Sequence, residues 1–161
     1  MSLGLGLRAK ELTSLKWTDV YDAEGRVRPV LHLRAAYTKG GKTRDAFLSS
    51  PALRRVLSKY GEGQWLLGAR AWHGPLFQSQ KHGPMTPASM ARFLKSLYRE
   101  AGISGASSHS GRRTLITRLA ERGIDLKAIA EIAGHRSIRT TAVYIESNPR
   151  RLSRILQDVT W

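Results

Sequence analysis

The second half of the chain is divided by helix start and stop signals, and these limit the fold more than any other feature. Thr86-Pro87 combines an N-cap residue with a proline at the first helical position, and Gly102 follows the last apolar residue of that segment. Apolar residues at helical spacing predict three further helices, over about 110–122, 125–134 and 137–144. We therefore expect this half to consist of helices.

The first half mixes helical and strand patterns. The stretch GLRAKELTSLKW places Leu7, Leu12 and Leu15 on one helical face. The stretch RPVLHLRAAYTKGGKTRDAF alternates around Gly40-Gly41, which predicts two strands joined by a two-residue hairpin turn. The fold class expected is α+β, mainly α, with a small antiparallel β-sheet near the N-terminus.

Two segments follow the hairpin and one ends the chain. Ser50-Pro51 begins a helix that we expect to end at Gly61, and residues 61–85 read as a loop with one short strand at most. A last amphipathic segment starts at Pro149, with apolar residues on one side and arginines on the other.

Charge identifies the class of partner. The 161 residues include 27 Lys and Arg against 12 Asp and Glu, a formal net charge of +15 that is spread along the chain. A basic body favours a polyanion, most simply double-stranded DNA, although a solvated basic surface would have the same composition. The absence of Cys, of a secretory leader and of any run near the roughly 18 apolar residues of a membrane span predicts a cytoplasmic protein.

Polar residues form a pattern that composition does not explain. Four short motifs stand in order along the chain: GLR..E at 6–11, TKGGKTR at 38–44, HSGRRT at 109–114, and GH at 134–135 with a tyrosine nine residues beyond. This pattern resembles the catalytic domain of the tyrosine recombinase (phage integrase) family, whose members cut and rejoin DNA through a covalent phosphotyrosine. The resemblance fills all six active-site positions of that family, with Arg8, Lys39, His109, Arg112, His135 and Tyr144.

The residue types suit phosphoryl transfer without a metal or another cofactor. Attack on a phosphodiester places negative charge on two non-bridging oxygens, and fixed cations or hydrogen-bond donors must stabilise it. Guanidinium groups match phosphate oxygens with two prongs and stay charged, so Arg8 and Arg112 are assigned as the clamp. His135 is expected to donate a third hydrogen bond.

The nucleophile and the leaving group both need proton transfer. A phenol with a pKa near 10 is about one part in a thousand ionised at pH 7, so Tyr144 requires a base. His109 lies three residues before Arg112 and is the candidate, although a helix N-cap histidine would look the same. Lys39 is the candidate acid for the departing 5′ oxygen, and Lys42 is the competing lysine.

Further residues are expected to support this site. Glu11, three residues after Arg8, should hold the Arg8 guanidinium rather than contact DNA. The motif departs from the family pattern at Gly111 and Ala133, where leucines are usual, and a glycine in the first turn should loosen that helix. Five further basic residues are candidate phosphate contacts: Lys42, Arg44, Arg113, Arg136 and Arg139.

The resemblance also implies a domain plan. Residues 1–161 correspond to a catalytic domain, without the separate DNA-binding domain and first catalytic helices that precede it in family members. We therefore expect a fragment of a longer integrase that forms a homotetramer on DNA. Residues 149–161 correspond to a C-terminal segment that family members exchange between protomers.

Two other interpretations remain open from the sequence. Residues 126–145 also fit a helix-turn-helix DNA-binding module, with Arg139 and Thr140 reaching bases, but this leaves Arg8, Lys39, His109 and Arg112 unexplained. A type IB topoisomerase would relax DNA with the same catalytic residues and without joining two partners.

Overall fold

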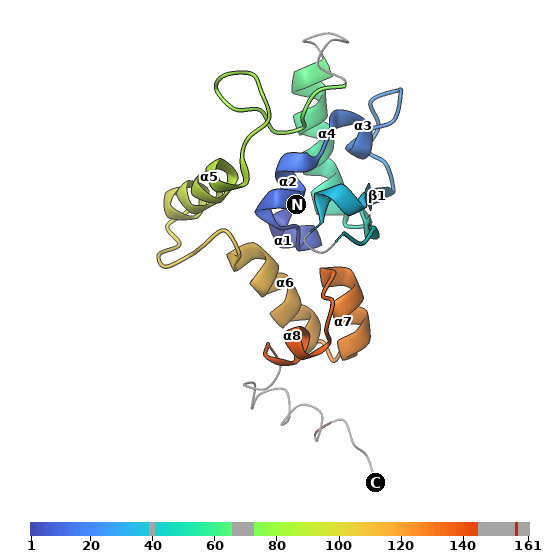
Figure 1. Cartoon of the computed structure of the whole chain (residues 1–161), viewed down its shortest axis with the longest axis vertical. Coiled ribbons are helices and arrows are strands. Elements are labelled where there is room, and N and C mark those ends of the chain that lie inside the picture. Colours follow the sequence, from blue (N-terminus) through green and yellow to red (C-terminus); the bar gives the residue numbers. More distant parts are fainter. Residues whose placement is uncertain (39–40, 66–72, 145–156, 158–161) are drawn as a thin grey trace.

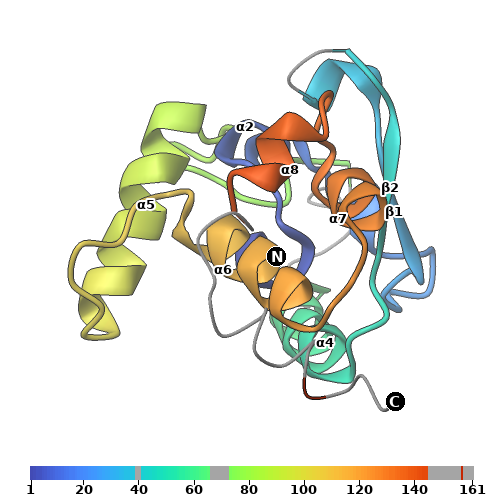
Figure 2. The ribbon, with the colours of Figure 1, turned by 90° about the horizontal axis from the view of Figure 1, so that it is seen from below.

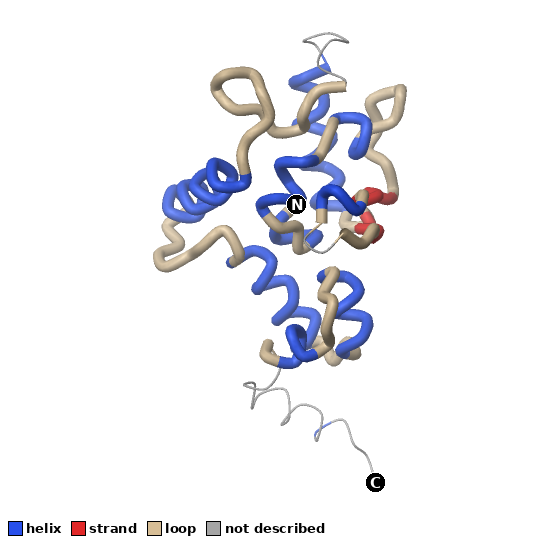
Figure 3. Tube along the Cα trace, viewed as in Figure 1, coloured by secondary structure: helices blue, strands red, loops and turns tan. Residues whose placement is uncertain are grey.

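A computed structural model describes residues 1–38, 41–65, 73–144 and 157 of the chain, with only the backbone of residues 64 and 65. Within these ranges the chain is mainly helical, with one small sheet (Figures 1 and 3). The helices are α1 Ser2–Leu5, α2 Ala9–Ser14, α3 Trp17–Val20, α4 Pro51–Trp65, α5 Pro87–Glu100, α6 Ser110–Glu121, α7 Leu126–Ala133 and α8 Arg139–Ala142. The strands are β1 Val30–Leu33 and β2 Arg44–Phe47, with a 3-10 helix, η1 Ala35–Tyr37, between them. The expected fold class is confirmed.

The two strands pair antiparallel, but their connection is not the two-residue turn that the sequence suggests. Leu33 pairs with Arg44, so residues 34–43 all belong to the connection. The chain first turns through η1, and the Thr38 hydroxyl lies 2.8 Å from the Lys42 carbonyl oxygen, which ties the base of the loop. Gly41 therefore lies in a longer connection, and the prediction of a two-residue hairpin turn was wrong.

Local capping signals set the ends of the later helices. The Thr86 hydroxyl accepts from the backbone N–H of Ser89 at the start of α5. Asp125 caps α7 in the same way, and Gly134 ends that helix with a positive φ of 63°. The expected helices over 110–122 and 125–134 are confirmed, whereas α8 covers only the middle of the segment predicted as helical.

Gly61 does not end α4, contrary to the expectation. The helix continues to Trp65, and the glycine serves a packing contact. A Cβ at this position would lie 2.8 Å from Cε1 of Tyr21, a fully buried residue of the core. Residues 73–85 form two isolated β-bridges in place of the short strand that we allowed for. One joins Pro75 to Lys16, and the other joins Gln78 to Pro84.

Two apolar clusters divide the molecule. The larger one extends from the N-terminal segment through the sheet and α4 to Met90 of α5. It includes Leu7, Leu12 and Leu15, which are buried as expected, although the helix α2 contains only Leu12 of the three. The smaller one joins Ile116 and Ala120 of α6 to Ile129 and Ala133 of α7, with Tyr144 packed against it. Figures 1 and 2 show α6, α7 and α8 grouped beside the N-terminal body.

Gly111 allows the two parts to approach closely, which differs from the loosening role expected for it. It is buried, and a Cβ there would lie 2.5 Å from the Tyr98 hydroxyl oxygen and 3.0 Å from the backbone nitrogen of Leu3. A larger residue would push α6 away from α1, so the glycine sets the distance between these helices. No helix in the described part of the chain is long and apolar enough to cross a membrane.

Candidate active site

Arg8 stands at the N-cap position of α2 and is held by a buried carboxylate. Glu11 has no exposed surface, and its carboxylate accepts from the Arg8 backbone N–H at 2.8 Å and from Arg8 Nη1 at 3.0 Å. Arg8 Nη2 donates to the carbonyl oxygen of Gly134 at 3.2 Å. The expected ion pair is present, and the hydrogen bond to Gly134 links Arg8 to the end of α7.

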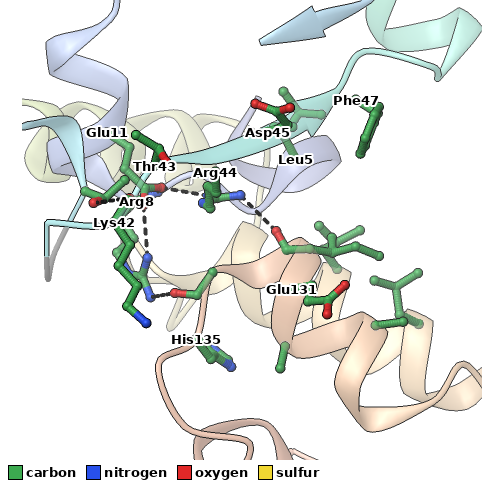
Figure 4. Close-up of a pocket in the computed structure, with 18 of the residues that line it drawn as sticks. Leu5, Arg8, Glu11, Lys42, Thr43, Arg44, Asp45, Phe47, Glu131 and His135 are labelled. Atoms are coloured by element: carbon green, nitrogen blue, oxygen red, sulfur yellow. Dashed lines mark hydrogen bonds and ion pairs between the residues drawn. The ribbon is translucent and has the colours of Figure 1, made fainter. Parts of the chain in front are cut away.

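Arg44 is the second arginine on the same carboxylate. Its Nη2 lies 3.0 Å from Glu11 Oε2, and its Nη1 donates to the Ile132 carbonyl oxygen at 2.9 Å (Figure 4). A Cβ on Gly134 would lie 2.6 Å from Arg44 Cδ and Nε, so the arginine packs directly on that glycine. Burial lowers the pKa of Arg44, and the Glu11 charge opposes this shift.

These contacts give Arg44 a structural role. Its side chain is only 11% exposed and joins β2 to α2 and α7. Replacing such a group would leave Glu11 partly unpaired in the interior. Its role in this structure is to hold the end of α7, immediately before His135.

Arg112 lies in α6 and is buried, with unused donors. Its Nη1 donates to the Gly6 carbonyl oxygen at 2.6 Å, whereas its Nη2 is buried with no hydrogen-bond partner in the described structure. Burial and repulsion from Arg8 lower the pKa of Arg112 to about 10, which still leaves it charged at neutral pH. A buried cationic donor without a partner is costly unless an anion such as phosphate satisfies it.

His135 and Tyr144 complete the group. The backbone N–H of His135 donates to Ala130, and its ring Nδ1 lies 2.7 Å from Thr141 Oγ1. Burial, then the charges of Arg112, Arg8 and Arg44, lower the pKa of His135 to about 4. The Tyr144 ring stacks on the imidazole, with centroids 6.4 Å apart and planes inclined by 15°, and it lies near enough to Arg112 to raise that arginine's pKa slightly.

A cleft of about 730 Å³ runs between β2 and the α6–α7 pair beside these residues. Its lining includes the basic residues Arg8, Lys42 and Arg136 with His135, the carboxylates of Asp45 and Glu131, and apolar side chains such as Phe47. Figure 4 shows Arg8, Lys42 and His135 on one side of this space, coming from three different parts of the chain.

Other predicted residues are not gathered there. His109 occupies the N-cap position of α6, is exposed, makes no side-chain capping bond and has no hydrogen bond to Arg112, His135 or Tyr144 in the described part. Arg113 and Arg139 are exposed. Lys39 lies outside the described residues, as does the segment 149–161 apart from residue 157. Among the described residues, no group of three or more His, Cys, Asp or Glu could hold a metal ion.

Sequence reasoning missed Thr141, which is fully buried against His135. The only sequence signal is a threonine pair that begins five residues after the histidine, and helical spacing does not predict a contact across the turn between α7 and α8. The structural importance of Arg44 was also hidden, because its partners are 33 and 88 residues away.

The fold and the site define a helical domain with an arginine-lined cleft, and comparison with known proteins assigns its family. Residues 1–151 match the Phage integrase family. The chain therefore belongs to this family. It is 33% identical over 151 residues to the tyrosine recombinase XerC of Pelobacter propionicus, a match that covers 93% of this chain and 46% of that protein.

Other relatives agree. The tyrosine recombinase XerA of Pyrococcus furiosus is 31% identical over 158 residues, covering 96% of this chain and 50% of that protein. The chain thus spans about half the length of these relatives. A crystal structure of XerA recombinase superposes with a TM-score of 0.77 at 24% identity, covering 99% of this chain and 57% of that one, which supports the fold. XerH in its post-cleavage complex with difH DNA gives 0.68 at 22% identity, covering 98% and 43%.

Proposed function

We propose that this chain is the catalytic part of a site-specific DNA recombinase that cleaves and rejoins strands through a covalent 3′-phosphotyrosine. The observation that carries the proposal is the grouping of Arg112 and Tyr144 around Arg8 and His135, two residues that line the cleft, although up to 136 positions separate the four residues. Membership of the Phage integrase family supports the same reading.

In the proposed reaction the Tyr144 oxygen attacks the phosphorus atom. The bond from phosphorus to the 5′ oxygen breaks, a 3′-phosphotyrosine forms, and the 5′ oxygen leaves with a proton. Arg8, Arg112 and a neutral His135 donate to the two non-bridging oxygens. At roughly 4 Å and an effective dielectric constant of about 20, each arginine charge is worth on the order of 4 kcal/mol.

Two proton transfers are assigned. His109 is the proposed base for the Tyr144 phenol, and its exposed ring at the start of α6 would have to approach Tyr144 when DNA binds. Lys39 is the proposed acid for the 5′ oxygen. Lys42 stays the alternative, because it lines the cleft together with Arg8 and His135.

Double-stranded DNA is the proposed partner. Lys42, Arg113, Arg136 and Arg139 are exposed and could contact phosphates, and the solved XerH structure is itself a complex with its difH DNA. A helix-turn-helix module is disfavoured, because α8 has four residues, about 6 Å of helix. We place the whole protein in the cytoplasm, acting on the nucleoid as a homotetramer.

Covalent capture tests this function. The chain is incubated with a pool of nicked duplexes of random sequence, the mixture is denatured in detergent, and DNA that stays attached to protein is recovered and sequenced. The nick lets the short 5′-hydroxyl fragment diffuse away, so the phosphotyrosine accumulates. We expect attachment with the natural chain and none with Tyr144→Phe, which keeps the ring and its stacking on His135.

The result has clear alternatives. Attachment that persists in Tyr144→Phe would identify another nucleophile, and no attachment above the Tyr144→Phe background would contradict cleavage by this chain. A type IB topoisomerase would relax a supercoiled plasmid that lacks the recovered sequence, whereas a recombinase should exchange strands only between two duplexes that carry it.

A further inference from the structure

Thr141 contacts the His135 ring through a buried hydroxyl group. The residue has no exposed surface, and its Oγ1 lies 2.7 Å from Nδ1 of His135. Within the described part of the chain, this is the only hydrogen bond of the Thr141 side chain. The chain turns between α7 and α8, and this turn brings Thr141 within hydrogen-bond distance of His135.

Hydrogen accounting decides the direction of this bond. A hydroxyl has one hydrogen to donate, and a buried hydrogen without an acceptor is costly. If Nδ1 carried the imidazole hydrogen and donated it, the Thr141 hydrogen would have no acceptor among the described residues. If the hydroxyl donates to Nδ1, the buried Thr141 hydrogen has an acceptor, and the imidazole hydrogen lies on Nε2.

We propose that Thr141 is a positioning residue whose hydroxyl donates to Nδ1 of His135 and so fixes the neutral imidazole with its hydrogen on Nε2. The Nε2 atom makes no hydrogen bond to a described residue, and His135 lines the cleft beside Arg8 (Figure 4). The ring therefore offers a donor to the cleft and no lone pair.

Two further observations fit this arrangement. Burial, together with the positive charges of Arg112, Arg8 and Arg44, lowers the pKa of His135 to about 4, so the imidazole is neutral near pH 7 and its tautomer matters. The non-bridging oxygens of a phosphodiester accept hydrogen bonds and cannot donate them. The other tautomer would point a lone pair at such an oxygen and would repel it.

This inference deepens the proposed function, and its first test does not depend on that function. The chain is labelled with ¹⁵N-histidine, and long-range ¹H–¹⁵N correlation spectra at pH 7 report which ring nitrogen carries the hydrogen. His135 is assigned by its loss in His135→Asn. We expect a single Nε2–H form in the natural chain and in Thr141→Ser, which keeps the hydroxyl.

Thr141→Val, which has a similar shape and no hydroxyl, should give a changed Nδ1 resonance and a mixture of tautomers. Thr140→Val is the matched control, because the neighbouring threonine is exposed, and its spectrum should equal that of the natural chain. An Nδ1–H form in the natural chain, or an unchanged His135 signal in Thr141→Val, would overturn the proposal even if the variant were less stable.

A second readout connects the tautomer to catalysis. With the duplex recovered by covalent capture, Thr141→Val should form the adduct about tenfold more slowly, the factor that corresponds to the net loss of about one hydrogen bond, at unchanged DNA affinity. Thr141→Ser should recover most of the rate. An equal fall in affinity, or no rescue by serine, would show that Thr141 only supports the fold. If the natural chain forms no adduct, the proposed function fails, and the spectra still decide the tautomer.

Discussion

The three arginines of the site differ in exposure and in the partners of their donors. A guanidinium has five N–H donors. Arg8 and Arg44 each have two side-chain hydrogen bonds, one of them to Glu11, and Arg112 has one, to Gly6. Arg8 is 21% exposed against 11% for Arg44, and Arg112 Nη2 is buried without a partner among the described residues. These features fit Arg8 and Arg112 as the proposed clamp, and the Arg44 contacts hold the end of α7.

The neutral state of His135 predicts a specific pH dependence of stability. Its pKa is about 4 in the folded chain against an ordinary value of 6.5, so between these values the unfolded chain binds a proton that the folded site does not. The free energy of unfolding should therefore fall as the pH is lowered through this window. Urea unfolding of the natural chain and of His135→Asn, at several pH values from 7 to 4, measures the effect.

We expect the natural chain to lose more stability than His135→Asn over that pH range, because the asparagine does not titrate. The remaining histidines contribute equally to both proteins and cancel in the difference. Parallel pH curves for the two proteins would mean that the His135 environment does not favour the neutral ring.

The identity of the acid can be tested with sulfur. A thiolate leaves without a proton, because the pKa of a thiol is many units below that of an alcohol. If sulfur replaces the bridging 5′ oxygen of the captured duplex, Lys39→Ala should cleave it at close to the natural rate and fail on the oxygen substrate. Arg112→Ala should stay defective on both substrates. Rescue of Lys42→Ala in place of Lys39→Ala would transfer the role to the lysine that lines the cleft.

At the scale of elements, the end of α7 is fixed by contacts that only glycine permits. Gly134 has a φ of +63°, and a Cβ there would lie 2.6 Å from Arg44. Gly123, after α6, has a φ of +76° with nothing within 4 Å of its Cβ position. Gly123→Ala should therefore lose only the backbone term, about 1 kcal/mol, whereas Gly134→Ala should lose at least about 1 kcal/mol more through displacement of Arg44.

Urea denaturation of the two variants gives this comparison directly. The displacement should also loosen His135, so Gly134→Ala is expected to slow adduct formation, with Gly123→Ala close to the natural rate. Similar losses of stability in both variants would show that the Arg44 side chain moves aside at little cost.

At the scale of the whole molecule, the proposed assembly depends on residues 149–161, of which the structure describes only residue 157. We expect a chain that ends at residue 148 to keep its helical circular dichroism and its melting temperature, but to assemble poorly on a duplex with two recombination sites. The apolar side of residues 149–161 is narrow, and the family resemblance implies that this segment packs on a neighbouring protomer. Mobility-shift and sedimentation measurements would follow the assembly, and unfolding of the shortened chain would show that the segment packs on its own domain.

The sequence by itself determined the features that depend on near neighbours. Helix starts at Thr86 and Asp125 involve backbone groups within three residues, and both caps are present. The ion pair of Arg8 with Glu11 spans one helical turn and was expected for the same reason. Family motifs also named Arg8, Arg112, His135 and Tyr144, which the structure brings together.

Only the tertiary structure decided the meaning of residues whose signals have more than one reading. A glycine such as Gly61 can end a helix or leave room for a neighbouring side chain. Here it leaves room for the ring of Tyr21, which lies 40 positions earlier in the sequence. An arginine in a basic chain can face phosphate or fill the interior, and Arg44 is buried because Glu11 and the end of α7 meet it from distant segments. The Thr141 contact with His135 has the same origin. Local patterns record interactions along one helix or strand, whereas burial and hydrogen-bond partners are fixed only when separate segments pack against each other.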